Sequence, residues 1–257
     1  MSLEELYGLF FQRKSKILEA LIEQKKIKLS GNLYYYTQIQ FAYNSNRIEG
    51  SKLTEDETRM LYETNTLLES KGTLVDDVFE TANHFHLFNV MLDEIDSDLS
   101  EDIIKKYHKI LLNGTSASYK KWFNVGEYKV LANEVGGTST TNPKNVEFEI
   151  KTLLIWYSTV SNKKIEDLIE FHYKFEKIHP FQDGNGRIGR MILFRECLKN
   201  NIVPFIITDE YKAYYYRGLS EFREEPSYLM DTCLLMQDYY RNICSKFLNI
   251  EADQFRG

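Results

Sequence analysis

Apolar residues recur every three or four positions along most of this 257-residue chain, with charged residues between them. A period near 3.6 residues is typical of amphipathic helices that bury one face. Some boundaries carry matching signals, such as the capping box of Thr54 with Glu57 and the Asn142-Pro143 pair. The predicted helices span residues 4–28, 32–49, 54–68, 74–95, 100–112, 142–161, 165–178, 186–200, 208–222 and 226–250.

The segment 125–141 breaks this pattern. Its sequence, V-G-E-Y-K-V-L-A-N-E-V-G-G-T-S-T-T, mixes β-branched and aromatic residues with glycine and asparagine and has no helical period. Such a mixture predicts a β-hairpin or an extended loop. We therefore expect an all-α fold, a helical bundle, with one small β-hairpin.

The composition narrows the class of protein. Hydrophobic residues make up 43% of the chain, which is enough for a substantial core. The formal net charge is −6 and the basic pairs are scattered, which argues against nucleic acid as a partner. No apolar run is long enough to span a membrane, no signal-peptide core is visible, and the three cysteines lack C-x-x-C spacing. These features predict a soluble, cytoplasmic protein with buried thiols and no membrane partner.

Residues 179–190 read H-P-F-Q-D-G-N-G-R-I-G-R, and a loop does not need this chemistry in order to fold. His179 is a candidate general base, because imidazole is the side chain whose unperturbed pKa lies nearest neutrality. Asp183 offers hard carboxylate oxygens that suit Mg²⁺. The first half of this stretch therefore combines a base with a metal ligand.

The second half of the stretch is suited to binding an anion. Gly184, Asn185 and Gly186 allow a tight turn whose backbone N–H groups can converge on one point. The apolar spacing that follows predicts a helix beginning near Gly186, and its positive dipole end faces the same point. Arg187 and Arg190 are three positions apart and share one side of the first turn. The inferred ligand is a metal-bound polyphosphate.

The same glycines also spell a different motif. Gly184, Gly186 and Gly189 form G-x-G-x-x-G, the dinucleotide-binding fingerprint. That motif requires an apolar strand directly before it. Residues 165–178 instead show helical spacing, and His179-Pro180 intervenes. We therefore reject the dinucleotide-binding interpretation.

The stretch resembles, position for position, the Fic family signature H-x-F-x-[D/E]-G-N-G-R-x-x-R. The resemblance implies an all-helical Fic-type bundle, and most members with the intact signature transfer AMP from ATP to a protein hydroxyl. It implies that His179 is the base, that Phe181 anchors the loop in the core, and that Asp183 holds Mg²⁺. The implied phosphate contacts are Gly184, Asn185, Gly186, Arg187 and Arg190, and the implied adenine contacts are Tyr215 and Leu219.

A second motif, S-N-R-I-E-G, lies at residues 45–50. Ser45 and Glu49 are four apart and share one helix face, and the helix dipole disfavours an anion at Glu49. A partner cation is therefore expected, although an exposed Glu at a helix end is the simpler alternative. The motif resembles the family's inhibitory pattern [S/T]-x-x-x-E-[G/N]. That resemblance implies that Glu49 pairs with Arg190 and pulls it away from the γ-phosphate of ATP.

Residues 126–129, G-E-Y-K, resemble the start of the family's flap, where Arg is commoner than Lys at the last position. In the family the flap adds backbone pairing to the target's modified stretch. The resemblance thus implies an unidentified target protein that docks at 125–141. Eighteen tyrosines also make self-modification plausible, and the sequence leaves open whether the chain forms homo-oligomers.

The other histidines indicate no second site. His84 and His86 are two apart on a predicted helix, so they point to different sides and cannot share a metal. His108 lies among lysines, and we expect it at the surface. His172 lies on the apolar face of its helix, where a core residue with a hydrogen-bond partner is expected.

The resemblance implies three regions and one leading function. Residues 1–70 are an N-terminal helical region with the inhibitory helix, 71–225 the Fic catalytic core, and 226–257 a C-terminal helix packed on the core. The implied function is that of an autoinhibited, Mg-ATP-dependent protein adenylyltransferase that modifies Ser, Thr or Tyr and releases pyrophosphate, with AMP removal as a further activity. Two alternatives stay open: transfer of phosphate or phosphocholine on the same scaffold, and a non-catalytic nucleotide-sensing module.

Overall fold

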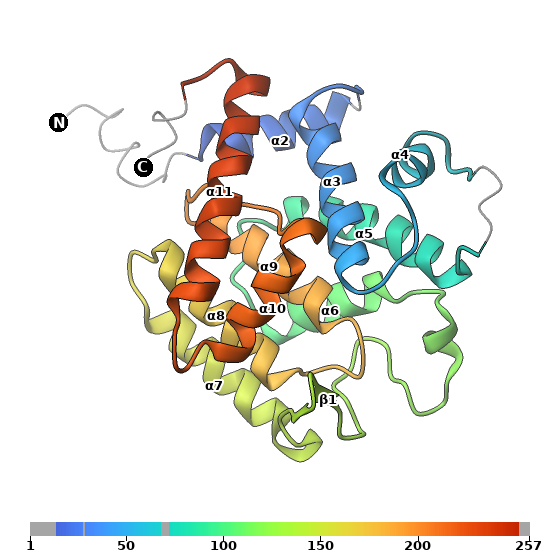
Figure 1. The fold of residues 1–257 in the computed structure, drawn as a ribbon, viewed down its shortest axis with the longest axis vertical. Coiled ribbons are helices and arrows are strands. Elements are labelled where there is room, and N and C mark those ends of the chain that lie inside the picture. Colours follow the sequence, from blue (N-terminus) through green and yellow to red (C-terminus); the bar gives the residue numbers. More distant parts are fainter. Residues whose placement is uncertain (1–13, 28, 68–71, 252–257) are drawn as a thin grey trace.

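The computed structural model describes residues 14–27, 29–67 and 72–251, and this part of the chain is mostly helical (Figure 1). Its α-helices are α2 (Lys16–Ile27), α3 (Leu33–Ile48), α4 (Glu55–Thr64), α5 (Val75–Asp93), α6 (Glu101–Leu111), α7 (Val146–Thr159), α8 (Ile165–Ile178), α9 (Asn185–Lys199), α10 (Lys212–Glu221) and α11 (Ser227–Leu248). Short 3₁₀ helices are η1 (Ser116–Tyr119), η2 (Pro143–Asn145) and η3 (Asp209–Tyr211). None of these described helices is long and apolar enough to cross a membrane.

The predicted fold class is confirmed, because the helices are accompanied only by a small hairpin in the described residues. Its strands, β1 (Glu134–Val135) and β2 (Thr138–Ser139), are antiparallel and have two residues each. The turn between them consists of Gly136 and Gly137, both at positive φ, as tight hairpins favour. The hairpin is thus much shorter than segment 125–141, for which a β-hairpin or an extended loop was predicted. The start of the first predicted helix, residues 4–13, lies outside the described residues.

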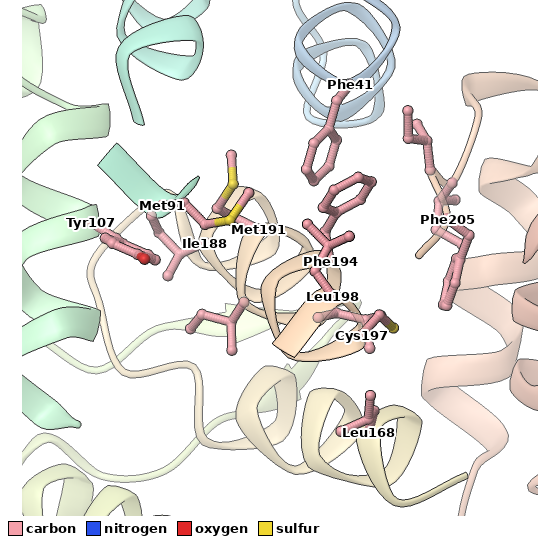
Figure 2. Close-up of a cluster of buried hydrophobic side chains, with 14 of the residues drawn as sticks. Phe41, Met91, Tyr107, Leu168, Ile188, Met191, Phe194, Cys197, Leu198 and Phe205 are labelled. Atoms are coloured by element: carbon pink, nitrogen blue, oxygen red, sulfur yellow. The ribbon is translucent and has the colours of Figure 1, made fainter. Parts of the chain in front are cut away.

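Helix α9 is the centre of the bundle (Figure 1). It packs against α8, α6, α3 and α5, and nearly all of its residues are buried. Figure 2 shows Phe194 of α9 pointing toward Phe41 of α3, with the ring centroids 5.0 Å apart. Because a helix that is covered on all sides has little freedom to shift, α9 gives the residues at its N-terminus a rigid support.

Helix α3 is also part of the core. Leu33, Phe41 and Ile48 along its length are buried to 1% exposure or less. The helix contacts α2, α4, α5, α9 and α11. The predicted inhibitory motif therefore lies at the end of a fully packed helix, on the side where α9 begins.

Candidate active site

The backbone turns sharply on both sides of the loop between α8 and α9. His179 ends α8 in the left-handed conformation, with φ +52°, and Pro180 cannot continue the helix. Gly184 precedes α9 with φ +79°, which costs a glycine little. Phe181 is fully buried, and the Asn185 side chain closes the loop around it: the Phe181 N–H donates to Asn185 Oδ1 at 2.8 Å, and Asn185 Nδ2 donates to the Phe181 carbonyl at 2.9 Å. Both polar atoms of the Asn185 side chain are therefore hydrogen-bonded within the loop.

The His179 imidazole is mostly buried and lines a cavity of about 740 Å³. Burial lowers its pKa to about 4, and the nearby cation of Lys129 acts in the same direction. An imidazole with this pKa is neutral near pH 7 and has a free electron pair for a proton. His179 therefore has the protonation state that a general base needs.

His108 corrects an expectation, because it is fully buried rather than at the surface. Its ring stacks on Phe181 with the centroids 3.9 Å apart. The Gly126 N–H donates to His108 Nδ1 at 2.8 Å, so Nε2 carries the proton and donates to the Asp183 carbonyl at 3.1 Å. His108 therefore fastens the loop to the segment before the hairpin. The sequence did carry a signal for the burial of His108, because positions 104, 108 and 111 share the apolar face of α6.

Asp183 lies at the edge of this loop with a side chain that is 57% exposed. Its Oδ1 accepts a hydrogen bond from the Gly184 N–H at 2.6 Å and lies 3.5 Å from an Arg187 nitrogen. The described residues contain no group of three His, Cys, Asp or Glu side chains that could hold a metal without further ligands. A single accessible carboxylate suits Mg²⁺ that also takes phosphate oxygens and water.

Arg187 has a partner that the sequence did not indicate. It is buried, and its NH1 forms an ion pair with Glu80 of α5. Burial raises the pKa of Glu80, although the Arg187 guanidinium opposes that rise. The Arg187 Nε has no hydrogen-bond partner among the described residues. Arg187 therefore keeps one donor available for a further acceptor.

Arg190 is the residue on which the second motif converges. Its Nε donates to Ser45 Oγ at 3.1 Å and its NH2 to the Ser45 carbonyl at 2.9 Å. The same NH2 donates to Glu49 Oε1 at 2.7 Å. Burial favours the neutral Glu49 carboxyl, but the guanidinium groups of Arg190 and Arg187 outweigh it and hold the pKa of Glu49 below its usual range. The structure thus brings Ser45 and Glu49 together with Arg190.

Gly186 makes room for this ion pair. A Cβ at that position would lie 2.3 Å from Glu49 Oε1 and 3.0 Å from Arg190 NH1. The Arg190 NH1 has no hydrogen-bond partner in the described part of the chain. The carboxylate of Glu49 therefore sits against the first turn of α9, where the helix N-terminus attracts anions.

Helix α10 also contacts the end of α3. The Lys212 ammonium donates to the Ile48 carbonyl, and the Tyr216 hydroxyl donates to the same oxygen at 3.3 Å. The carbonyls of a last helical turn lack partners within the helix, and a cation is favourable there. These two contacts hold the turn that precedes Glu49 against the wall of the cavity.

The cavity lies between the hairpin and helices α8, α9 and α10, and its size is typical of a small-molecule site. Its lining includes His179, Gly186, Arg190, Tyr215, Leu219 and Glu49. Asp183, Gly184, Asn185 and Arg187 are not part of that lining. Tyr215 is fully buried, and its hydroxyl lies 2.7 Å from His172 Nε2, the partner expected for that core histidine.

Comparison with known proteins identifies the domain. Residues 98–196 match the model of the Fic/DOC family. The chain contains a Fic domain. A Fic-domain signaling protein from Bacteroides thetaiotaomicron superimposes with a TM-score of 0.68 and 22% identity, over 94% of this chain and 97% of that one. Fic-1 from C. elegans gives a TM-score of 0.64 and 22% identity, over 88% of this chain and 71% of that one.

The curated relatives of this Fic domain are named as adenylyltransferases. "Protein adenylyltransferase fic-1" of Caenorhabditis elegans is 26% identical over 189 residues, which are 71% of this chain and 36% of that protein. "Protein adenylyltransferase Fic" of Nematostella vectensis is 26% identical over 193 residues, 71% of this chain and 42% of that protein. The chain thus spans about two fifths or less of the length of these relatives.

Proposed function

We propose that this Fic-domain chain is a protein adenylyltransferase that moves AMP from ATP to a protein hydroxyl. One observation carries the proposal: neutral His179 and the cation of Arg190 line the same cavity, beside the N-terminus of α9. A base that faces a phosphate site is what transfer from a nucleotide requires. The names of the curated relatives support the same reaction.

In the proposed reaction, His179 takes the proton of a Ser, Thr or Tyr hydroxyl as its oxygen bonds to the α-phosphorus of ATP. The bond between that phosphorus and the oxygen bridging to the β-phosphate breaks, and pyrophosphate leaves with the electron pair. Backbone N–H groups of Asn185 and Gly186 stabilise the developing negative charge, whereas the Gly184 N–H donates to Asp183 Oδ1. Arg190, once released from Glu49, neutralises the leaving pyrophosphate.

The remaining site residues hold the nucleotide. Asp183 would hold Mg²⁺, and the bound metal would compensate charge on the phosphates of ATP. Arg187 uses its unpaired Nε toward the β-phosphate while NH1 stays on Glu80. Tyr215 and Leu219 form the adenine side of the cavity.

The Glu49–Arg190 pair makes the resting protein autoinhibited. Glu49 takes the guanidinium that the γ-phosphate needs, and its carboxylate adds negative charge where the nucleotide is to bind. The proposal includes a second role, in which the same carboxylate orients a water for hydrolytic removal of AMP from a modified target. Both roles follow from a carboxylate that lines the cavity.

The hairpin provides the docking site for the target. Strands β1 and β2 are exposed, and residues of both line the cavity that His179 also lines. An extended segment of a target protein, or of another copy of this chain, adds backbone hydrogen bonds to this hairpin. Its hydroxyl then reaches the imidazole.

The test is the fate of the label from two forms of ATP. With Mg²⁺ present, label from α-³²P-ATP is expected to become bound to protein, whereas label from γ-³²P-ATP is not. Labelling by the γ-form would instead indicate phosphate transfer, and no labelling by either form would contradict transferase activity. His179→Ala is the matched control, and it is expected to bind ATP but to transfer no AMP, because other groups hold the phosphates.

A further inference from the structure

The conformation of His179 needs support from its surroundings. A non-glycine residue at φ +52° is uncommon and persists only where neighbouring structure fixes it. The hydrogen bond from the His179 N–H to the Phe175 carbonyl ends α8 but does not orient the residues that follow. The Phe181–Asn185 hydrogen bonds support the loop from within, and a second support comes from another segment.

Lys129 supplies hydrogen bonds on both sides of His179. Its backbone N–H donates to the Pro180 carbonyl at 2.9 Å, and its Nζ reaches the Ile178 carbonyl at 3.4 Å. The carbonyls directly before and after the candidate base therefore share one partner residue. Lys129 is only 4% exposed, so these bonds form in a region that excludes water.

The same ammonium group also binds both ends of the hairpin. Its Nζ donates to Asn133 Oδ1 at 2.7 Å and to Thr140 Oγ1 at 2.5 Å. Asn133 and Thr140 flank β1 and β2, and the Thr140 N–H donates to the Asn133 carbonyl at 3.3 Å. Asn133 Nδ2 donates in turn to the Phe181 carbonyl at 3.1 Å. Lys129 therefore joins the neck of the hairpin to the loop of the candidate base.

We propose that Lys129 is a positioning residue, which holds His179 and the neck of the hairpin in one fixed relation. This inference rests on the proposed function, since the benefit is to place the hydroxyl of a docked target at the imidazole. A displacement of about 1 Å between reacting groups can reduce a rate about a hundredfold. One residue with four hydrogen bonds across the two segments, three from its ammonium group and one from its backbone N–H, prevents such a displacement.

The charge of Lys129 gives a measurement that does not depend on activity. After burial, this cation is the main influence that lowers the pKa of His179, while Glu49 and Asp183 act in the opposite direction. In Lys129→Met the His179 pKa, followed by NMR of the imidazole, is expected to rise. Lys129→Arg is expected to keep it low. Lys144→Met, which removes an exposed lysine near the same hairpin, is the matched control and is expected to leave it unchanged.

The pH profile separates positioning from a general role in folding. Burial lowers the pKa of Lys129 itself to about 8, so the wild-type rate is expected to fall between pH 7 and 9 as the amine loses its proton. Lys129→Arg stays charged and is expected to retain its rate there. The buried Glu176, whose pKa is raised to about 8, titrates in both proteins. Its effect on the pH profile is therefore the same in both and cancels when the two profiles are compared.

Kinetics and a second variant complete the test. Lys129→Met is expected to lower kcat for AMP transfer at least tenfold with KM for ATP little changed. The half-exposed Asn133→Ala, which cuts the link to Phe181 without disturbing the core, is expected to give a smaller loss in the same parameter. An unchanged His179 pKa and unchanged kcat in Lys129→Met would overturn the inference. Absence of transfer by the wild type would instead overturn the proposed function, while the NMR titration still tests Lys129.

Discussion

Replacing Glu49 with glycine tests the proposed inhibition directly. The substitution removes the carboxylate that lies 2.7 Å from Arg190 and leaves the two hydrogen bonds from Arg190 to Ser45 in place. Glu49 follows the last residue of α3, where glycine is well tolerated. The change is therefore expected to free the guanidinium without unfolding the helix.

The magnitude follows from the burial of the pair. Removing one partner of a fully buried ion pair costs roughly 3–5 kcal/mol. Arg190 is 3% exposed but the Glu49 side chain is 31% exposed, so solvent weakens the pair. We take about 2 kcal/mol for the preference of Arg190 for Glu49. This free energy corresponds to a ratio of roughly 30 between molecules with the ion pair and molecules without it. Arg190 is then free in about 3% of the molecules.

The assay is the initial rate of protein labelling from α-³²P-ATP at saturating Mg²⁺. Glu49→Gly is expected to label itself and a target about 30-fold faster than the wild type. Glu49→Gln, which keeps the shape but removes the charge, is the matched control and is expected to lie between the two. The double variant Glu49→Gly with Arg190→Ala is expected to show no gain, because the freed guanidinium is the group that restores productive ATP binding.

Two results would refute this reasoning. Equal transfer rates in the wild type and Glu49→Gly would show that the ion pair does not limit activity. A gain that survives in the double variant would show that the carboxylate acts by its own charge rather than through Arg190. Loss of AMP from a modified target, followed with the same proteins, separately tests the hydrolytic role, which predicts slower removal by Glu49→Gly.

Three further changes have defined outcomes. Asp183→Ala is expected to lose most activity and its dependence on Mg²⁺; coincident Mg²⁺ titrations of variant and wild type would exclude it as a metal ligand. Lys212→Met removes the cation bound to the Ile48 carbonyl and is expected to raise transfer a few-fold, but not when Glu49→Gly is also present. The free energy of unfolding, measured by urea titration, is expected to fall from pH 6.5 toward 4, because unfolding lets four buried imidazoles bind protons. Glu176 has the opposite effect, because it is already protonated in the folded state and releases its proton on unfolding. Glu80, whose pKa is also raised by burial, acts in the same direction as Glu176. Each net proton taken up on unfolding contributes about 1.4 kcal/mol per pH unit, and a flat profile would contradict these pKa directions. The imidazoles are those of His84, His108, His172 and His179, with pKa values lowered to about 3, 4, 3 and 4 by burial.

Local spacing predicted most of the helices, and the motif at residues 45–50 predicted the placement of Ser45 and Glu49 beside Arg190. The i,i+4 spacing of Ser45 and Glu49 was enough to put both on one helix face, and a carboxylate in a last turn was enough to predict a cation. The start of α9 at Asn185, next to the predicted Gly186, agrees with the glycines of the loop. Each of these depends on residues only a few positions apart.

Contacts between distant segments could not be read in the same way. Nothing near Glu80 indicates its ion pair with Arg187, because that pair depends on how α5 packs beside α9. The lysines around His108 suggested a surface, but the ring occupies the apolar side of α6. Nothing near Lys129 and Asn133 indicates that their side chains bond to the loop at 178–181, beside the short hairpin.

The burial of α3 limits how the proposed inhibition can be relieved. Burying one large apolar side chain is worth about 1.5–3 kcal/mol, and Leu33, Phe41 and Ile48 are only three of those that α3 contributes. Detaching the helix therefore costs far more than the ion pair it carries. Under the proposed inhibition, an activator is expected to rotate one side chain after the last turn of α3. Proteolysis or a shortened expression clone that lacks α3 is expected to yield an insoluble chain rather than an active one.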